Sequence, residues 1–321
     1  MGSYLRLLAL FLLPVLLLLA GTERLLRRIP NDYSFKHRRM IEEGSSFKVL
    51  VLGNSHAYKG IDPDLMGSVG FNAANISQDL RYDRAILEKY LPSLPNLQHL
   101  VLPISYGSLG AELEQGRESW RVKNYVLYMG ISEYATGLEH HLELVNRPMR
   151  DQVRMVRRYV QHGSDNRVCS ESGTGSQRPA ADLDLQRSGE DAAARHRRTS
   201  AEGIERSRHE LERIVRLATE RGIRVHLVTT PAYATYRNAL NEPQLRNAIS
   251  TCEHLARTNT LVDYIDLMAD PRFLVDDFAD ADHLSVPGQR KLSRILGEWI
   301  GTLPSNAVQA ADTVTSIGDP H

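Results

Sequence analysis

The chain has 321 residues, which is long enough for one or two domains with a sizeable buried core and excludes a disulfide-stabilised miniprotein. Its 39 basic residues balance its 39 acidic residues, whereas nucleic-acid-binding proteins are usually strongly basic. With 42% hydrophobic and 24% charged residues the composition is that of a globular protein, and we expect no nucleic-acid partner. The two cysteines, Cys169 and Cys252, lack the spacing of a zinc site or a redox pair, and the sequence leaves a disulfide between them open.

The first predicted element is an apolar N-terminal segment. No residue from Leu7 to Gly21 is charged, and eleven of these fifteen residues are Leu, Phe or Val. We expect residues 1–29 to form a membrane anchor, with a cleaved signal peptide as the alternative, because Ala20-Gly21-Thr22 resembles a cleavage site. A buried core helix is the third interpretation. Basic residues flank both ends of the segment, so charge alone does not fix its orientation in a membrane.

Strand-like and helix-like patterns alternate through the rest of the chain. Helical periodicity appears at residues 79–91, at 201–221 and from about 285 onward. Between these helices, short apolar runs followed by turn residues predict buried parallel strands at residues 47–52, 69–72, 100–104, 223–229 and 261–267. This alternation predicts an α/β protein, a three-layer α/β/α sandwich around a mostly parallel five-stranded sheet.

Two regions stand apart from this pattern. Residues 164–200 are rich in Ser, Gly, Asp, Gln and Arg and contain few large aliphatic residues, so we expect a mobile insert. Residues 304–321 are expected to form a disordered tail. The predicted organisation is therefore an N-terminal segment over 1–29, one domain over 30–303 that carries the insert, and the tail.

Ser55 is the candidate nucleophile. It lies in Leu52-Gly53-Asn54-Ser55-His56, directly after the first predicted strand, and ligands of open parallel sheets bind beyond the carboxyl ends of the strands. Glycine allows a tight turn there, and the serine hydroxyl and nearby backbone N–H groups can face the same crevice. An ordinary turn gives the same local pattern, because Gly, Asn and Ser are all turn residues.

A candidate base and its carboxylate partner occur near the end of the chain. In Asp280-Ala281-Asp282-His283 an aspartate precedes a histidine by three residues, just before the last predicted helix. A serine hydroxyl needs a base such as imidazole, and the imidazole needs a carboxylate to fix its tautomer. Ser55, His283 and Asp280 would fill these roles. The alternative is a solvated acidic loop.

Together, Gly53-Asn54-Ser55-His56 and Asp280-Ala281-Asp282-His283 resemble the first and last blocks of the SGNH/GDSL hydrolase superfamily. The resemblance implies a flavodoxin-like fold over 30–303 with Ser55, Asp280 and His283 as catalytic residues, and it requires no metal and no organic cofactor. With the N-terminal segment, the chain is similar to membrane-attached members that add or remove acyl groups on cell-envelope polysaccharides. The resemblance thus implies an esterase or transferase that moves an O-acyl group, most plausibly acetyl, through an acyl-serine intermediate. It further implies an acylated polysaccharide as substrate, envelope-biosynthesis proteins as partners, and an extracytoplasmic catalytic domain.

The sequence departs from that family in two blocks. The second block, here residues 71–78, lacks the usual Gly, and the third block, here residues 103–108, lacks the Asn that donates to the oxyanion. The candidates that remain for oxyanion or substrate binding are Asn54, His56, Asn75, Ser77 and Ser105. The missing Asn also keeps a second interpretation open, a non-catalytic carbohydrate-binding or assembly protein of the cell envelope.

Overall fold

The computed structural model of the chain describes residues 2–146, 148–163, 165–179, 183–198 and 200–303. These residues form two compact units. The N-terminal unit comprises Met1–Arg39 and Leu113–Val168, and the sheet unit comprises Met40–Glu112 and Cys169–His321. The predicted tail, 304–321, lies outside the described residues.

The sequence predicted one domain over 30–303, whereas the structure divides these residues between two units. Residues 30–39 and 113–168 cluster with the N-terminal segment instead of the sheet. Specific contacts explain the difference, because the Glu23 carboxylate accepts hydrogen bonds from the backbone N–H groups of Glu143 and Leu144. Such contacts join segments more than a hundred residues apart, which no local pattern encodes.

The sheet unit is built on five parallel strands in the order β2-β1-β3-β4-β5. In the middle of the sheet, Leu50 lies between Phe71 and Leu100, and all three side chains are fully buried. Burial on both faces explains the continuous apolar runs. The strands are β1 (Val49–Val51), β2 (Gly70–Asn72), β3 (His99–Pro103), β4 (Arg224–Thr229) and β5 (Val262–Asp266).

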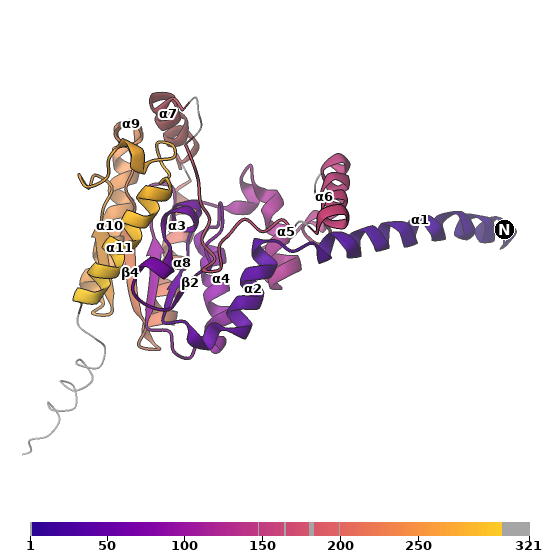
Figure 1. The fold of residues 1–321 in the computed structure, drawn as a ribbon, viewed down its shortest axis with the longest axis horizontal. Coiled ribbons are helices and arrows are strands. Elements are labelled where there is room, and N and C mark those ends of the chain that lie inside the picture. The colour runs from indigo at the N-terminus through magenta and orange to yellow at the C-terminus, as the bar shows by residue number, and fades with distance from the viewer. Residues whose placement is uncertain (1, 147, 164, 180–182, 199, 304–321) are drawn as a thin grey trace, which may run out of the picture. The chain divides into compact units, whose positions relative to one another are not determined.

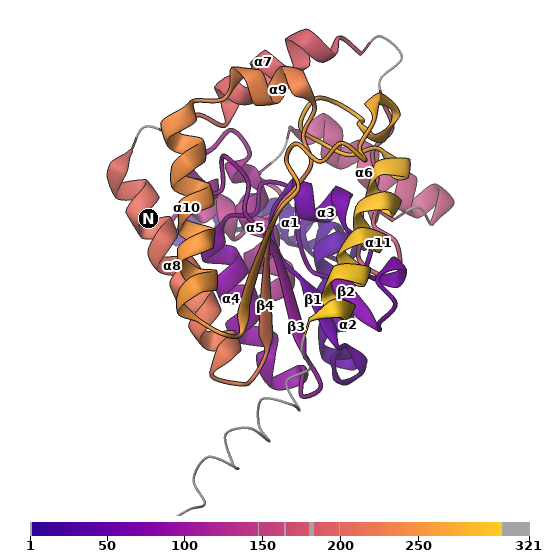
Figure 2. The same cartoon turned by 90° about the vertical axis from the view of Figure 1, so that its left-hand side faces the viewer.

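Helices cover both faces of this sheet, which confirms the predicted three-layer α/β/α sandwich. Helices α4 and α8 pack together, as do α3 and α11. Figure 2 shows α4, α8 and α10 on one side of the strands and α11 on the other. The helices are α3 (Ser55–Gly60), α4 (Leu80–Tyr90), α7 (Leu185–Arg195), α8 (Ala201–Thr219), α9 (Ala234–Ala239), α10 (Glu242–Thr258) and α11 (Val286–Thr302).

The N-terminal unit begins with the helix α1, Gly2–Arg28 (Figure 1). Its apolar residues from Leu7 to Leu19 are exposed. Its stretch Arg6–Arg28 is long and apolar enough to cross a membrane, although a signal sequence passes the same test. The other helices that begin in this unit are α2 (Asp32–Glu42), α5 (Val122–Asn124) and α6 (Met149–His162).

The predicted insert, 164–200, contains a helix. Residues Leu185–Arg195 form α7, which packs on α9. The packing uses small residues, since Ala192 and Ala193 are buried and a Cβ on Gly189 would lie 2.6 Å from backbone and side-chain atoms of Thr235. Close approach of helices through small side chains needs none of the large aliphatic residues that the insert lacks. Cys169 and Cys252 are both buried, and no disulfide bond joins these two described residues.

Candidate active site

The fold places the ends of β1 and β3 at the point where the strand order reverses. In a parallel sheet of order 2-1-3-4-5, the chain leaves β1 and β3 toward opposite sides, which opens a crevice at their carboxyl ends. Ser55 follows β1, and Ser105 follows β3 by two residues. The crevice is therefore the expected ligand position, and the candidate nucleophile lies beside it.

The turn between β1 and α3 sets the position of Ser55. Gly53 has a φ of 121°, a backbone conformation that favours glycine. Asn54 then caps α3, because its side-chain oxygen accepts a hydrogen bond from the backbone N–H of His56 at 3.0 Å. Ser55 is the first residue of the helix, where backbone N–H groups have no intrahelical acceptor and can bind a negatively charged oxygen.

His283 links the nucleophile to a carboxylate. Its Nε2 lies 2.8 Å from Ser55 Oγ, and its Nδ1 lies 3.0 and 3.1 Å from the two oxygens of Asp280. These are ordinary hydrogen-bond distances, and they order the three groups as hydroxyl, imidazole and carboxylate. The structure thus brings together the three residues that the sequence predicted to be catalytic.

The loop that carries Asp280 and His283 is held from several sides. An isolated bridge between Phe278 and Leu284 closes the loop, and Asp280 Oδ1 also accepts a hydrogen bond from the backbone N–H of His283 at 2.8 Å. The insert adds two further contacts. Gln177 Nε2 donates to Asp280 Oδ2 at 2.8 Å, and Ser188 Oγ accepts the backbone N–H of Ala281 at 3.1 Å.

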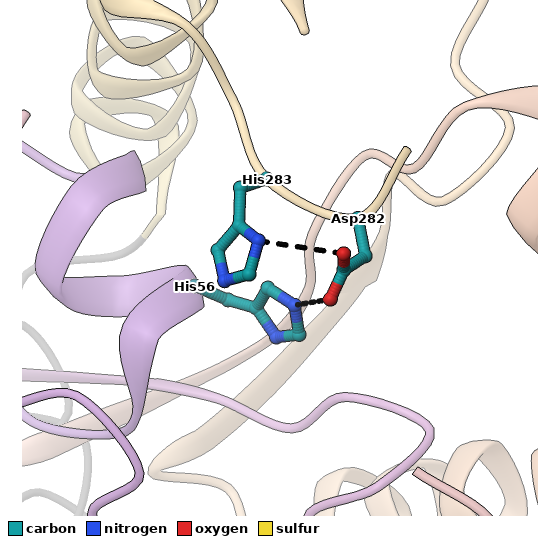
Figure 3. Close-up of side chains that lie close together, drawn as sticks. All are labelled: His56, Asp282 and His283. Atoms are coloured by element: carbon teal, nitrogen blue, oxygen red, sulfur yellow. Dashed lines mark hydrogen bonds and ion pairs between the residues drawn. The ribbon is translucent and has the colours of Figure 1, made fainter. Parts of the chain in front are cut away.

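A second carboxylate, Asp282, lies beside His283 and His56 (Figure 3). Its Oδ1 is 3.4 Å from His283 Nδ1, and its Oδ2 is 3.4 Å from His56 Nε2 and 3.7 Å from His196 Nδ1. The buried Asp282 carboxylate therefore faces three imidazole rings. His283 donates its Nδ1 proton to Asp280, at the shorter distance, so Asp282 acts on His283 mainly through its charge.

These contacts shift the ionisation of the site. Burial lowers the pKa of His283, but the Asp282 charge and the hydrogen bond to Asp280 outweigh it and raise this pKa to about 9. Burial raises the pKa of Asp282, yet the neighbouring His283 and His56 hold it well below its usual value. Burial lowers the pKa of His196 to about 4, so this ring is neutral near pH 7.

The same three side chains, His56, Asp282 and His283, are of metal-ligating types, and their candidate ligand atoms lie within 4.8 Å of one another. However, both nitrogens of His283 already contact Ser55 and Asp280. A metal ion bound to this group would therefore displace one of the triad's hydrogen bonds.

The loop after β2 carries the candidate oxyanion donors Asn75 and Ser77. Asn75 is buried, and its Nδ2 donates to Ala73 O at 3.2 Å and to Gln78 Oε1 at 2.8 Å, so its side chain is committed to the loop. The Asn75 amide, which the sequence offered as a candidate for oxyanion or substrate binding, therefore donates within its own loop. Ser77 has a φ of 59°, the left-handed conformation that a glycine would adopt without strain.

A buried carboxyl group connects this loop to the nucleophile turn. Asp83 Oδ1 accepts hydrogen bonds from the backbone N–H of Gly53 and from Gln78 Nε2, both at 2.7 Å. Burial raises the pKa of Asp83 to about 7, even though both hydrogen bonds favour the charged form. Gln78 and Asp83 thus tie the Ser77 loop to the turn that precedes Ser55.

The remaining predicted residues lie at the edge of the crevice or behind it. Asn54 Nδ2 is 3.5 Å from Ser105 Oγ, which also pairs with Ser108 Oγ at 3.0 Å. His56 is buried, and its Nδ1 has no hydrogen-bond partner among the described residues. Its contact with Asp282 indicates an electrostatic role rather than direct substrate contact.

Sequence reasoning did not assign a role to Asp282, His196, Gln177 or Asp83. Asp282 lies within the predicted Asp-x-x-His motif, and its acidic neighbours made it resemble a solvated residue. The other three come from separate segments, and only the tertiary fold brings them to the site.

No protein-family model matches this chain, and neither does any curated protein. Among solved structures, it is similar to a candidate platelet activating factor from Streptococcus pneumoniae, with 12% identity, a TM-score of 0.42, and coverage of 91% of this chain and 99% of the other. A candidate acylhydrolase from Bacteroides fragilis has 14% identity, a TM-score of 0.38 and coverage of 82% and 94%. A GDSL-like lipase from Bacteroides thetaiotaomicron has 11% identity, a TM-score of 0.39 and coverage of 83% and 97%. All three TM-scores are below 0.5, so the site is assigned on the geometry of this chain alone.

Proposed function

We propose that this protein is a serine-dependent enzyme that cleaves or transfers an O-acyl group, with Ser55 as nucleophile, His283 as base and Asp280 as the carboxylate that orients it. The observation that carries the proposal is the continuous contact from Ser55 Oγ through both nitrogens of His283 to Asp280. A solvated acidic loop would not hold His283 in contact with Ser55, which lies 228 residues earlier in the sequence.

The reaction proceeds in two halves. In the first, the Ser55 hydroxyl proton passes to His283 Nε2 while Oγ forms a bond to the acyl carbonyl carbon, and the carbonyl oxygen becomes negatively charged. The carbon–oxygen bond to the leaving alcohol then breaks, and His283 returns the proton to that alcohol. An acyl-serine ester remains. In the second half, water or an acceptor hydroxyl loses its proton to His283 and attacks the acyl carbon of this ester. The bond from that carbon to Ser55 Oγ then breaks, and His283 returns the proton to Oγ.

The oxyanion is stabilised by donors at the carboxyl ends of β1 and β2. The backbone N–H of Ser55 at the first position of α3 is the first donor, since no described residue pairs with it within the helix. The left-handed Ser77 supplies the second from its backbone, and the Asn54 amide beside Ser105 takes the place of the missing third-block Asn.

The substrate class and location follow from the resemblance and from α1. We assign the acyl group as acetyl on an extracytoplasmic polysaccharide, the protein as anchored by α1, and proteins of envelope biosynthesis as its partners. The anchor is supported over a cleaved signal because α1 continues without interruption to Arg28, and its last turn, including the buried Leu26, packs into the N-terminal unit.

The test is esterase activity of the full chain in detergent on p-nitrophenyl acetate, followed by intact mass after reaction with a serine-directed fluorophosphonate. We expect one label on the wild type and none on Ser55→Ala or His283→Ala. Ser250→Ala, which removes an exposed hydroxyl on α10, is the matched control and retains activity and label. Adding acetylated and free oligosaccharides then separates transfer from hydrolysis.

A non-catalytic carbohydrate-binding protein is the second candidate, favoured by one observation. The side chain of Asn75 is committed to its own loop, and Ser105 stands where the resembled family has its oxyanion Asn. If wild type, Ser55→Ala and His283→Ala are equally inactive and unlabelled while the chain still binds polysaccharide, this second function is correct.

A further inference from the structure

Helix α6 of the N-terminal unit exposes an aligned apolar stripe. Met149, Val153 and Val160 are 75%, 60% and 69% exposed. They are four and seven residues apart, so at 3.6 residues per turn they lie along one line of the helix. Isolated exposed apolar residues are common on protein surfaces, but a continuous stripe marks a surface that binds something.

Arginines lie next to this stripe. Helix α6 carries Arg150, Arg154 and Arg157 beside the stripe and Arg158 on the opposite side, but only one acidic residue, Asp151. The ion pairs of Asp151 with Arg150 and Arg154 are long, at 3.8 and 3.5 Å, and both arginines are well exposed. A helix with an apolar stripe beside cationic side chains is typical of helices that lie in the headgroup region of an anionic bilayer.

Hydrogen bonds fix α6 to the end of α1. The Glu23 carboxylate of α1 accepts the backbone N–H groups of Glu143 and Leu144 at 3.1 and 3.0 Å. The buried Gln152 of α6 donates to the backbone carbonyls of the same two residues, at 3.2 and 2.7 Å. The segment 143–144 thus connects the two helices, and α6 lies where α1 ends.

The direction of α6 fits a membrane surface. In Figure 1 its axis runs across the axis of α1 rather than along it. If α1 crosses a bilayer, a helix that runs across it at its end lies parallel to the membrane plane. This is the orientation in which one face of an amphipathic helix can enter the headgroup layer.

We propose that α6 is an interfacial helix that binds the surface of an anionic lipid bilayer. Met149, Val153 and Val160 enter the boundary between headgroups and acyl chains, and Arg150, Arg154 and Arg157 bind lipid phosphates. The proposal rests on α1 being the anchor, and it adds a second attachment that fixes the orientation of the N-terminal unit on the membrane. Lipid is the occupant that the structure favours, because α6 is cationic and is joined to a helix able to cross a bilayer.

The test uses the full chain reconstituted in phosphatidylcholine vesicles with and without phosphatidylglycerol. Nitroxide labels are attached in four variants, Val153→Cys, Val160→Cys, Arg158→Cys and Leu16→Cys. The accessibility of each label to oxygen and to a water-soluble nickel complex gives its depth in the bilayer. The wild-type chain, labelled in parallel, measures any reaction of the buried Cys169 and Cys252. Arg158 lies on the same helix but away from the stripe and is the matched control.

We expect the Leu16 label within the acyl region in both lipids. In anionic vesicles the labels at 153 and 160 are shielded from nickel several-fold more than the label at 158, and this difference falls when Arg150, Arg154 and Arg157 are changed to Glu. One result would contradict the proposal: the Leu16 label lies in the bilayer, but the labels at 153 and 160 are as accessible to nickel as the label at 158. In that case α6 does not bind lipid, and its stripe is a site for another protein. If the Leu16 label is accessible to nickel, the anchor is wrong and the inference falls with it. Both outcomes leave the esterase test of Ser55 unaffected.

Discussion

Replacing Asp282 with Asn is expected to change the pH dependence of the proposed esterase activity. Its charge is the largest contribution that raises the pKa of His283 to about 9. Only the neutral imidazole accepts the Ser55 proton, and with a pKa of about 9 roughly 1% of the enzyme carries it at pH 7 and about half at pH 9. In the wild type, kcat/KM on p-nitrophenyl acetate should therefore rise about 50-fold over this range.

The Asp282→Asn variant should lose most of that rise. Without the charge, the His283 pKa falls toward its ordinary value of about 6.5, at which roughly three quarters of the rings are neutral at pH 7. The plateau activity falls as well, because a less basic imidazole is a weaker general base. The flattening of the profile is the decisive signature, since damage to the fold would lower the activity at every pH alike.

The assay is kcat/KM from pH 6 to 10, followed at the isosbestic wavelength of p-nitrophenol, with thermal unfolding as a check on folding. Asp276→Asn is the matched control, because Asp276 precedes the same loop but is exposed to solvent. It should keep the wild-type profile. A wild-type profile that is already flat above pH 7, or an Asp282→Asn profile that still rises 50-fold, would refute the electrostatic role of Asp282.

Three further changes test other parts of the site. Asp280→Asn should lower kcat by about 10⁴-fold, because the amide favours the wrong imidazole tautomer, as steady-state kinetics at pH 9 would show. In the wild type, the Asp83 pKa is raised from 3.8 to about 7, so the free energy of unfolding is highest below pH 4 and falls by at most about 4 kcal/mol as the pH rises to 7. Asp83→Asn should abolish this fall, because the amide does not ionise. Urea unfolding at pH 4 and pH 7.5 measures the difference. Ser77→Gly should raise the free energy of unfolding by up to about 1 kcal/mol at unchanged kcat, because glycine adopts this φ without strain; a loss of stability would contradict the strain.

The sheet was predictable because its signals are local. Each of the five strands falls at its predicted apolar run, to within two residues at either end. Strands β1 to β4 are almost entirely buried, which explains why their runs are largely apolar. The helices α4, α8 and α11 also agree with the predicted periodicity. In contrast, α7 was missed because its buried face is made of Gly and Ala, which carry no periodic hydrophobic signal.

The candidate triad was predictable for a different reason. Ser55 and the pair Asp280 and His283 each lie at a position that the fold forces to the carboxyl edge of the sheet, so finding the strands also located the residues. The contact from Gln177 to Asp280 could not be found in this way, since no strand or helix end directs that glutamine to the site.

The two aspartates of the loop, Asp280 and Asp282, act differently on His283 because they are buried to different depths. Asp280 is partly exposed, and both its oxygens face His283 Nδ1, so it fixes the direction of the ring and its tautomer. Asp282 is buried and lies farther from His283, and its carboxylate also faces the rings of His56 and His196. A buried charge acts more strongly at a distance than an exposed one, because less solvent screens it. Because of its deeper position, Asp282 therefore has the larger effect on the pKa of His283, whereas Asp280 orients the imidazole ring.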